Sequence, residues 1–211
     1  MTFSTKFITF EGGEGVGKST QVKKLSENLD NKGINCITTR EPGGSPGAEQ
    51  IRELLVKGGT DKWQPMTEAL LHNAARAEHL KKTVKPALKT GIWVISDRYV
   101  DSTLAYQGYG QGVDVETLLE LHKISTNDFW PNLTIILDGR ELHRATSREQ
   151  KNTDKEDRYE RMGDGFHKKL QQSFRDIAKN NPDRCVVVSS DGTIEEVAER
   201  VWQAIVNRFD L

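Results

Sequence analysis

Short apolar runs alternate with longer amphipathic stretches along this chain. The apolar runs predict five β-strands, at residues 6–10, 35–39, 91–95, 133–137 and 184–188. Helical spacing of apolar residues predicts helices at 19–32 and 67–89, and a last helix that begins at a capping box made by Thr193 and Glu196. The strands show little polar alternation, which is typical of strands covered by helices on both faces. The pattern therefore predicts an α/β fold with a largely parallel sheet.

Composition narrows the possible functions. Lys and Arg number 30 against 31 Asp and Glu, and this balance argues against a general nucleic-acid or anionic-membrane binder. No apolar run reaches 18 residues and residues 1–10 carry no signal-peptide pattern, so we expect a cytoplasmic protein. Cys36 and Cys185 belong to no metal-binding pattern and are expected to be buried free thiols. A length of 211 residues favours one domain, residues 1–211.

The strongest motif lies between the first predicted strand and the first helix. Residues 12–19 match the phosphate-loop pattern G-x-x-x-x-G-K-[ST], in which glycines let backbone N–H groups turn toward a phosphate chain. The helix N-terminus adds a partial positive charge there. Lys18 can reach the β- and γ-phosphates, and Ser19 can place its hydroxyl on Mg²⁺. We expect ATP to be bound by Gly12, Gly13, Glu14, Gly15, Val16, Gly17, Lys18, Ser19 and Thr20.

Two motifs that are typical of other phosphate-loop proteins are absent from this sequence. GTPases carry a downstream Asn-Lys-x-Asp, whereas the Asn-Lys pair here, Asn31-Lys32, is followed by Gly33 and Ile34. Motor ATPases end a strand with Asp-Glu, but the predicted strands here run into Asp97-Arg98 and Asp138-Gly139. Both absences favour a small-molecule kinase.

Further segments indicate the phosphoryl acceptor. Thr-Arg-Glu-Pro-Gly-Gly at 39–44 and Asp-Arg-Tyr at 97–99 follow predicted strands, where open parallel sheets bind their ligands. Ala-Ala-Arg at 74–76 lies in the long helix, and Ala-Tyr-Gln-Gly stands at 105–108. Together with the phosphate loop, this ordered set resembles the thymidylate kinases, which transfer the γ-phosphoryl group of ATP to dTMP. Over essentially the whole chain, the resemblance implies a P-loop five-stranded parallel sheet flanked by helices, Mg²⁺ as cofactor and a homodimer.

The resemblance also implies roles near the phosphates. Arg98 matches the arginine that binds the acceptor phosphate, and a guanidinium suits bidentate phosphate binding. Glu14 matches a carboxylate that contacts the sugar 3′-hydroxyl or the metal. Asp97 either binds magnesium-bound water or orients Arg98. Together with Ser19, Asp97 is our expected magnesium site.

Other positions match the family's acceptor pocket. Arg76 and Thr103 match residues that read the base edge, Tyr106 matches an aromatic beneath the sugar that crowds a 2′-hydroxyl, and Gln107 matches a polar contact near sugar and base. His72 stands where the family commonly has a Phe that stacks on thymine.

Each of these positions also has a simpler interpretation. The simpler interpretations are a surface arginine for Arg76, a core aromatic for Tyr106 and a surface histidine for His72. Glu41, expected to contact the substrate, alternatively pairs with Arg40.

Residues 140–165 are rich in charge and poor in large apolar side chains, which predicts a short mobile lid. The variable positions of the phosphate loop hold no cation, so we expect the lid to supply one, and it resembles the lid of the bacterial-type enzymes. Arg158 is the first candidate for contact with the transferred phosphoryl group, Arg148 is the second, and Arg144 is expected to pack on adenine. The alternative is a solvated charged loop.

The leading hypothesis is a thymidylate kinase that converts dTMP to dTDP for dTTP synthesis, with Lys18, Arg98, Arg158 and Glu14 as the catalytic group. A second hypothesis is another phosphate-loop kinase, acting on dUMP or a deoxynucleoside. A third is a nucleotide-binding module without transfer activity. The substrates expected as partners are dTMP and ATP, with no nucleic acid and no membrane.

Overall fold

The computed structural model describes residues 4–139 and 158–211. All strands of its single sheet run parallel, in the order β2-β3-β1-β4-β5. Their bounds lie within two residues of the predicted ones: β1 (Phe7–Glu11), β2 (Cys36–Arg40), β3 (Trp93–Asp97), β4 (Leu133–Asp138) and β5 (Cys185–Ser189). The predicted α/β class and five-stranded parallel sheet are confirmed.

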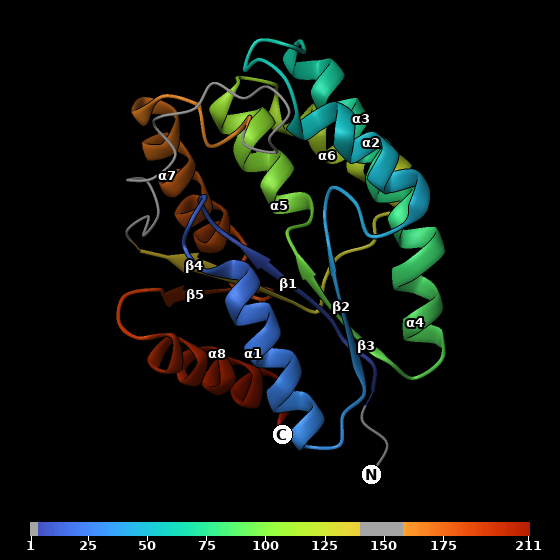
Figure 1. Cartoon of the computed structure of the whole chain (residues 1–211), viewed down its shortest axis with the longest axis vertical. Coiled ribbons are helices and arrows are strands. Elements are labelled where there is room, and N and C mark those ends of the chain that lie inside the picture. The colour runs from blue at the N-terminus through green and yellow to red at the C-terminus, as the bar shows by residue number, and fades with distance from the viewer. Residues whose placement is uncertain (1–3, 140–157) are drawn as a thin grey trace.

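Helices cover both faces of the sheet (Figure 1). On one face, α1 (Lys18–Asn31) and α8 (Ile194–Phe209) pack on side chains such as Ile8 and Ile135. On the other face, α6 (Val115–Thr126) and α7 (Asp164–Asn180) enclose a second core around Phe7 and Ile136. Neighbouring strand residues therefore enter different cores, because successive side chains of a strand point to opposite faces.

The long helix predicted at 67–89 is present as three consecutive segments, namely α3 (Pro65–His79), a π-helical turn (Leu80–Val84) and α4 (Lys85–Lys89). After β3, α5 (Val100–Thr103) runs into a second π-helical segment, η2 (Leu104–Gly110). The predicted capping box of α8 is confirmed.

The apolar pattern gave no prediction for several helices, among them α2 (Pro46–Val56), α6 and α7. Pro46 lies in the first turn of α2, and the Asp114 side chain accepts from the Thr117 amide at the start of α6. Both are helix-start signals that were present in the sequence.

Most of the expected lid, including Arg140, Arg144 and Arg148, lies outside the described residues. Its last part is described and forms a turn at 158–163 that leads into α7. Both cysteines are free as expected, with Cys185 buried but Cys36 only half-buried. Within 4–139 and 158–211, no helix has the length and apolar character needed to cross a membrane.

Candidate active site

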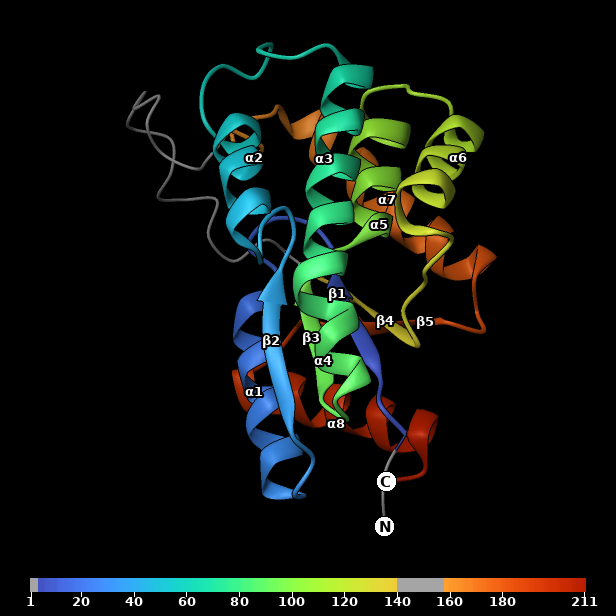
Figure 2. The same ribbon diagram turned by 90° about the vertical axis from the view of Figure 1, so that its right-hand side faces the viewer.

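The carboxyl ends of three neighbouring strands bring the predicted motifs to one edge of the sheet. Phe10 of β1 pairs with Asp97 of β3, and Asp97 pairs with Arg40 of β2. The segments that follow these strands therefore begin side by side. Figure 2 shows α2 and α3 lying beyond this edge, over the ends of the strands.

The phosphate loop has the backbone that the motif requires. Gly12, Gly15 and Gly17 have φ of 131°, 71° and 92°, a region that favours glycine. A Cβ on Gly12 would lie 2.5 Å from the Leu137 carbonyl oxygen, so only glycine fits there. The Lys18 ammonium donates to the carbonyls of Gly12 (3.2 Å) and Gly13 (2.5 Å). The loop is thus already curled around its own lysine.

Two expected magnesium ligands meet beside this loop. The Ser19 hydroxyl donates to Asp97 Oδ2 at 2.6 Å. Among the described residues, no group of three or more His, Cys, Asp and Glu side chains is placed to hold a metal ion. A cation bound at this pair would therefore need further oxygen ligands from water or phosphate.

Arg98 joins the phosphate loop to the acceptor side. Its Nη1 donates to the Gly12 carbonyl (3.1 Å) and the Ser102 hydroxyl (2.9 Å). Its Nη2 donates to the Tyr106 hydroxyl (3.0 Å) and pairs with Glu14 Oε1 (2.9 Å). Arg98 therefore points toward the loop that ends in Lys18.

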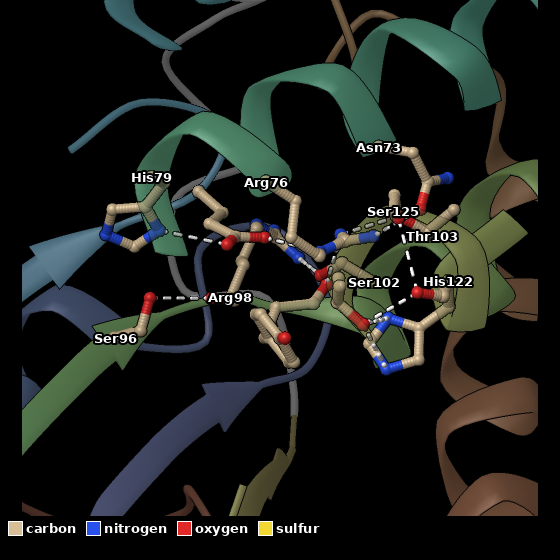
Figure 3. A network of polar contacts seen from close by, with 12 residues as sticks. Asn73, Arg76, His79, Ser96, Arg98, Ser102, Thr103, His122 and Ser125 are labelled. Carbon is tan, nitrogen blue, oxygen red and sulfur yellow. Dashed lines mark hydrogen bonds and ion pairs between the residues drawn. The ribbon is translucent and has the colours of Figure 1, made fainter. Parts of the chain in front are cut away.

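Three hydrogen bonds hold the backbone at Arg98, whose φ of 73° is unusual for a residue with a side chain. The Arg98 amide donates to the Phe10 carbonyl (2.9 Å), and the Ser96 hydroxyl donates to the Arg98 carbonyl (2.8 Å; Figure 3). The next amide, of Tyr99, donates to Glu11 Oε1 (2.7 Å). Such a conformation costs about 1–3 kcal/mol and persists where its surroundings fix it.

Glu14 is a carboxylate held between cations. Burial alone would raise the pKa of Glu14, but the charges of Arg98 and Lys18 lower it to about 2. The Tyr106 hydroxyl donates to it at 2.8 Å. At neutral pH Glu14 is ionised and can only accept hydrogen bonds, which suits contact with a hydroxyl or a cation.

Arg76 lies in a buried polar network. Its Nε donates to Glu41 Oε2 (2.8 Å), and its Nη2 donates to the Thr103 hydroxyl (2.9 Å) and the Tyr99 carbonyl (3.1 Å; Figure 3). His79 Nδ1 lies 2.9 Å from Glu41 Oε1. Arg76 is only 2% exposed, so the interpretation as a surface arginine is wrong.

Glu41 does not pair with Arg40, contrary to the simpler interpretation of its sequence position. Arg40 instead pairs with Glu49 at 3.1 Å, while Glu41 pairs with Arg76. The cause is burial, because Arg76 needs a buried partner whereas Arg40 lies half exposed at the end of β2.

Two adjoining cavities meet at these side chains. The first, of about 400 Å³, contains the phosphate loop and Asp97. The second, of about 120 Å³, contains His72, Ser102, Tyr106, Gln107 and Tyr159. Both cavities are lined by Glu14, Glu41, Arg52, Arg98 and Glu160. We call them the donor cavity and the acceptor cavity. Arg76 and Thr103 lie behind the acceptor cavity rather than in its wall.

Arg158 does not reach the phosphate loop in this structure. It is fully buried and pairs with Glu68 at 2.5 Å. Its guanidinium also donates to the carbonyls of Leu55 (3.2 Å), Gly59 (2.8 Å) and Thr60 (3.1 Å). These contacts anchor the turn at 158–163 to α2 and α3, and the expected catalytic role of Arg158 stays a prediction.

Several residues of the site were not predicted from the sequence. Arg52 lines both cavities and donates to the Pro42 carbonyl at 2.8 Å, but it lies on α2, a helix that was not predicted. Glu68 and Tyr159 are joined by a hydrogen bond of 2.9 Å across 91 positions of the sequence. No local pattern signals such a pairing.

The fold, the phosphate loop and the two adjoining cavities are those of a phosphate-loop kinase. The family model described as thymidylate kinase matches residues 10–201, and the chain belongs to this family. It is 42% identical over 202 residues to the thymidylate kinase of Rhizorhabdus wittichii, covering 96% of this chain and 97% of that protein.

Two further similar proteins are also thymidylate kinases. The chain is 45% identical over 207 residues to the thymidylate kinase of Afipia carboxidovorans, covering 97% of this chain and 90% of that one. The crystal structure of thymidylate kinase from Ehrlichia chaffeensis superimposes with a TM-score of 0.79 at 35% identity, covering 96% of this chain and 99% of that one.

Proposed function

We propose that the donor and acceptor cavities hold the two substrates of this kinase end to end. As a member of its family, the chain transfers the γ-phosphoryl group of ATP to dTMP and yields dTDP and ADP. The observation that carries the arrangement is the position of Arg98, which contacts the phosphate loop and lines both cavities. Transfer depends mainly on positioning and charge neutralisation, and Arg98 serves both.

The donor cavity binds the triphosphate of ATP. The loop amides and the N-terminus of α1 bind phosphate oxygens, and Lys18 turns from the Gly12 and Gly13 carbonyls to the β- and γ-phosphates. Ser19 and Asp97 would hold Mg²⁺, since both offer the hard oxygen ligands that this ion prefers. When bound, the ion neutralises phosphate charge.

The acceptor cavity binds dTMP. Arg98 binds its phosphate with Arg52 nearby, while Glu14 accepts a hydrogen bond from the sugar. Tyr106 packs beneath the sugar, and Gln107 and His72 contact the base. Arg76 and Thr103 act from behind the wall by fixing Glu41 and the end of α5.

An acceptor panel tests this proposal. The protein is mixed with ATP and Mg²⁺ and, in turn, dTMP, dUMP, dCMP or thymidine, and the release of ADP is measured. We expect dTMP to be phosphorylated fastest and thymidine hardly at all, because Arg98 needs an acceptor phosphate. A preference for thymidine or dUMP would favour another kinase activity, and no ADP with any acceptor would favour a nucleotide-binding module.

We also propose a homodimer formed through α2, α3 and α6. Leu54, Met66, Leu70, Leu119 and Ile124 on these helices are large apolar side chains that are 37–82% exposed. A second copy of the chain would bury them. Sedimentation should give a dimer for the wild type and a monomer for Leu70→Glu. A monomeric wild type would contradict this assembly. The cytoplasmic location stays a prediction.

A further inference from the structure

Glu68 is a buried carboxylate that accepts three hydrogen bonds and makes one ion pair behind the acceptor cavity. It lies on α3, is fully buried, and had no assigned role from the sequence. Its Oε1 accepts from Gln107 Nε2 (2.7 Å), Gln111 Nε2 (3.0 Å) and the Tyr159 hydroxyl (2.9 Å). Its Oε2 pairs with Arg158 Nη2 (2.5 Å). A carboxylate paired with arginine only accepts, so every partner must donate to it.

This requirement fixes the orientation of the side-chain amide of Gln107. Its NH₂ group must face Glu68, and its carbonyl oxygen, Oε1, therefore faces the other way. Gln107 lines the acceptor cavity, and no donor among the described residues reaches its Oε1. The cavity wall thus offers a hydrogen-bond acceptor at Gln107.

The same carboxylate determines which ring nitrogen of His72 carries the proton. Tyr159 has a single hydroxyl proton and donates it to Glu68, so its oxygen must accept from His72 Nε2, 2.8 Å away. Burial and the charges of Arg76 and Arg158 lower the pKa of His72 to about 3, so the ring is neutral. With its proton on Nε2, the ring keeps Nδ1 as an acceptor.

We propose that Glu68 is a positioning residue that sets the hydrogen-bond polarity of the acceptor cavity, so that this cavity selects bases with a ring N–H donor. The inference rests on the proposed binding of the acceptor base in this cavity. Thymine and uracil carry a proton on N3, whereas N3 of cytosine is an acceptor. If N3 of cytosine faced Gln107 Oε1, two acceptors would meet and neither would have a donor, which disfavours the binding of cytosine.

The variant Glu68→Gln tests the proposal because Arg158 can only donate. The new carboxamide must turn its oxygen to Arg158 and its NH₂ group to Gln107, whose amide then has to invert. Binding of dUMP and dCMP is measured by calorimetry, since both lack the methyl group of thymine. We expect the wild type to prefer dUMP, and the preference to fall by roughly tenfold or more in the variant. The KM for ATP should stay within about twofold.

Equal weakening of dUMP and dCMP in Glu68→Gln would overturn the proposal, because a merely structural role changes both alike. Gln111→Ala is the matched control. It removes another donor to the same oxygen but does not line the cavity, so the preference should be unchanged. Gln107→Leu tests whether the base binds in the acceptor cavity at all. If it leaves both affinities unchanged, the base does not bind in this cavity, and the site assignment fails rather than the polarity alone.

A measurement on the wild type covers the case in which Glu68→Gln does not fold around Arg158. NMR of the Gln107 side-chain amide should show one proton protected from exchange both without and with dTMP, because it donates to Glu68 in either state. Protons that exchange freely and become protected only when dTMP is added would show that the NH₂ group faces the base, and would overturn the proposal.

Discussion

The donor cavity and the acceptor cavity are built in different ways. Half of the residues that line the donor cavity come from one consecutive run, 14–20, and the loop owes its shape to glycines with positive φ. The acceptor side takes residues from the ends of β2 and β3, from α2, α3 and η2, and from the turn at 158–163. It is held by side chains that pair across long sequence distances, such as Arg76 with Glu41.

The position of a carboxylate in the fold also determines its charge. Glu11 and Glu14 lie three positions apart, yet burial, followed by the nearby Asp101, raises the pKa of Glu11 to about 8, whereas Arg98 and Lys18 overcome burial and lower that of Glu14 to about 2. The loop carboxylate faces cations, while the strand carboxylate receives the Tyr99 amide and the Ser102 hydroxyl inside the protein. Position in the fold, not residue type, decides which carboxylate is ready for chemistry.

Lys18→Ala should have the largest effect, because it removes the one loop side chain that carries positive charge to the transferred phosphate. We expect kcat to fall by roughly 10³-fold or more. The fold should persist because, among the described residues, the Lys18 ammonium makes hydrogen bonds only to Gly12 and Gly13 within its own loop. Single-turnover kinetics and circular dichroism check both points. Substantial residual transfer by a folded variant would contradict the phosphate-loop assignment.

Arg158→Ala should act on stability more than on chemistry. It leaves Glu68 buried without its counter-charge, which costs about 3–5 kcal/mol and lowers Tm by roughly 6–20 °C. The exposed pair of Arg175 and Asp138 supplies the control, since Arg175→Ala should cost less than about 1 kcal/mol. An unchanged Tm with a large loss of kcat would instead restore the catalytic role that the sequence predicted for Arg158.

The pH dependence of ATP use should report on Lys18. Burial and the charge of Arg98 lower the pKa of Lys18 to about 8, so the free enzyme loses this cation as pH rises through that value. We expect kcat/KM for ATP to fall above about pH 8, and kcat to fall only at higher pH because bound phosphates favour the charged lysine. Glu11→Gln, which removes the other group with a pKa of about 8, should keep the decline. A flat profile would count against this assignment.

His72→Phe should have the smallest effect. The variant loses one hydrogen bond to Tyr159 but keeps a ring in the acceptor cavity, so we expect the Kd for dTMP to change by less than about threefold. Because the pKa of His72 is lowered to about 3, the wild type and the variant should share one pH dependence between pH 5 and 7. Profiles that diverge near pH 6 would show that His72 titrates there.

The sheet and the backbone of the phosphate loop could be predicted from the sequence because both depend on local pattern. Apolar runs determine the strands, and the phosphate loop lies within eight consecutive residues. The acceptor side was predicted only in part. Arg98, Tyr106 and Gln107 were named from their motifs, but Arg52 lies on a helix without a clear periodic signal, and Glu68 joins groups that are distant in sequence. Such pairings arise from packing, and a single sequence does not encode them locally.

The most direct test of the central claim compares the binding of dTMP and thymidine by the wild type and by Arg98→Gln, using calorimetry. If Arg98 binds the acceptor phosphate beside the loop, the wild type prefers dTMP strongly, and the variant loses roughly 10- to 100-fold of that preference with little change for thymidine. A preference for dTMP that survives the substitution would contradict the account, because another group would then bind the phosphate.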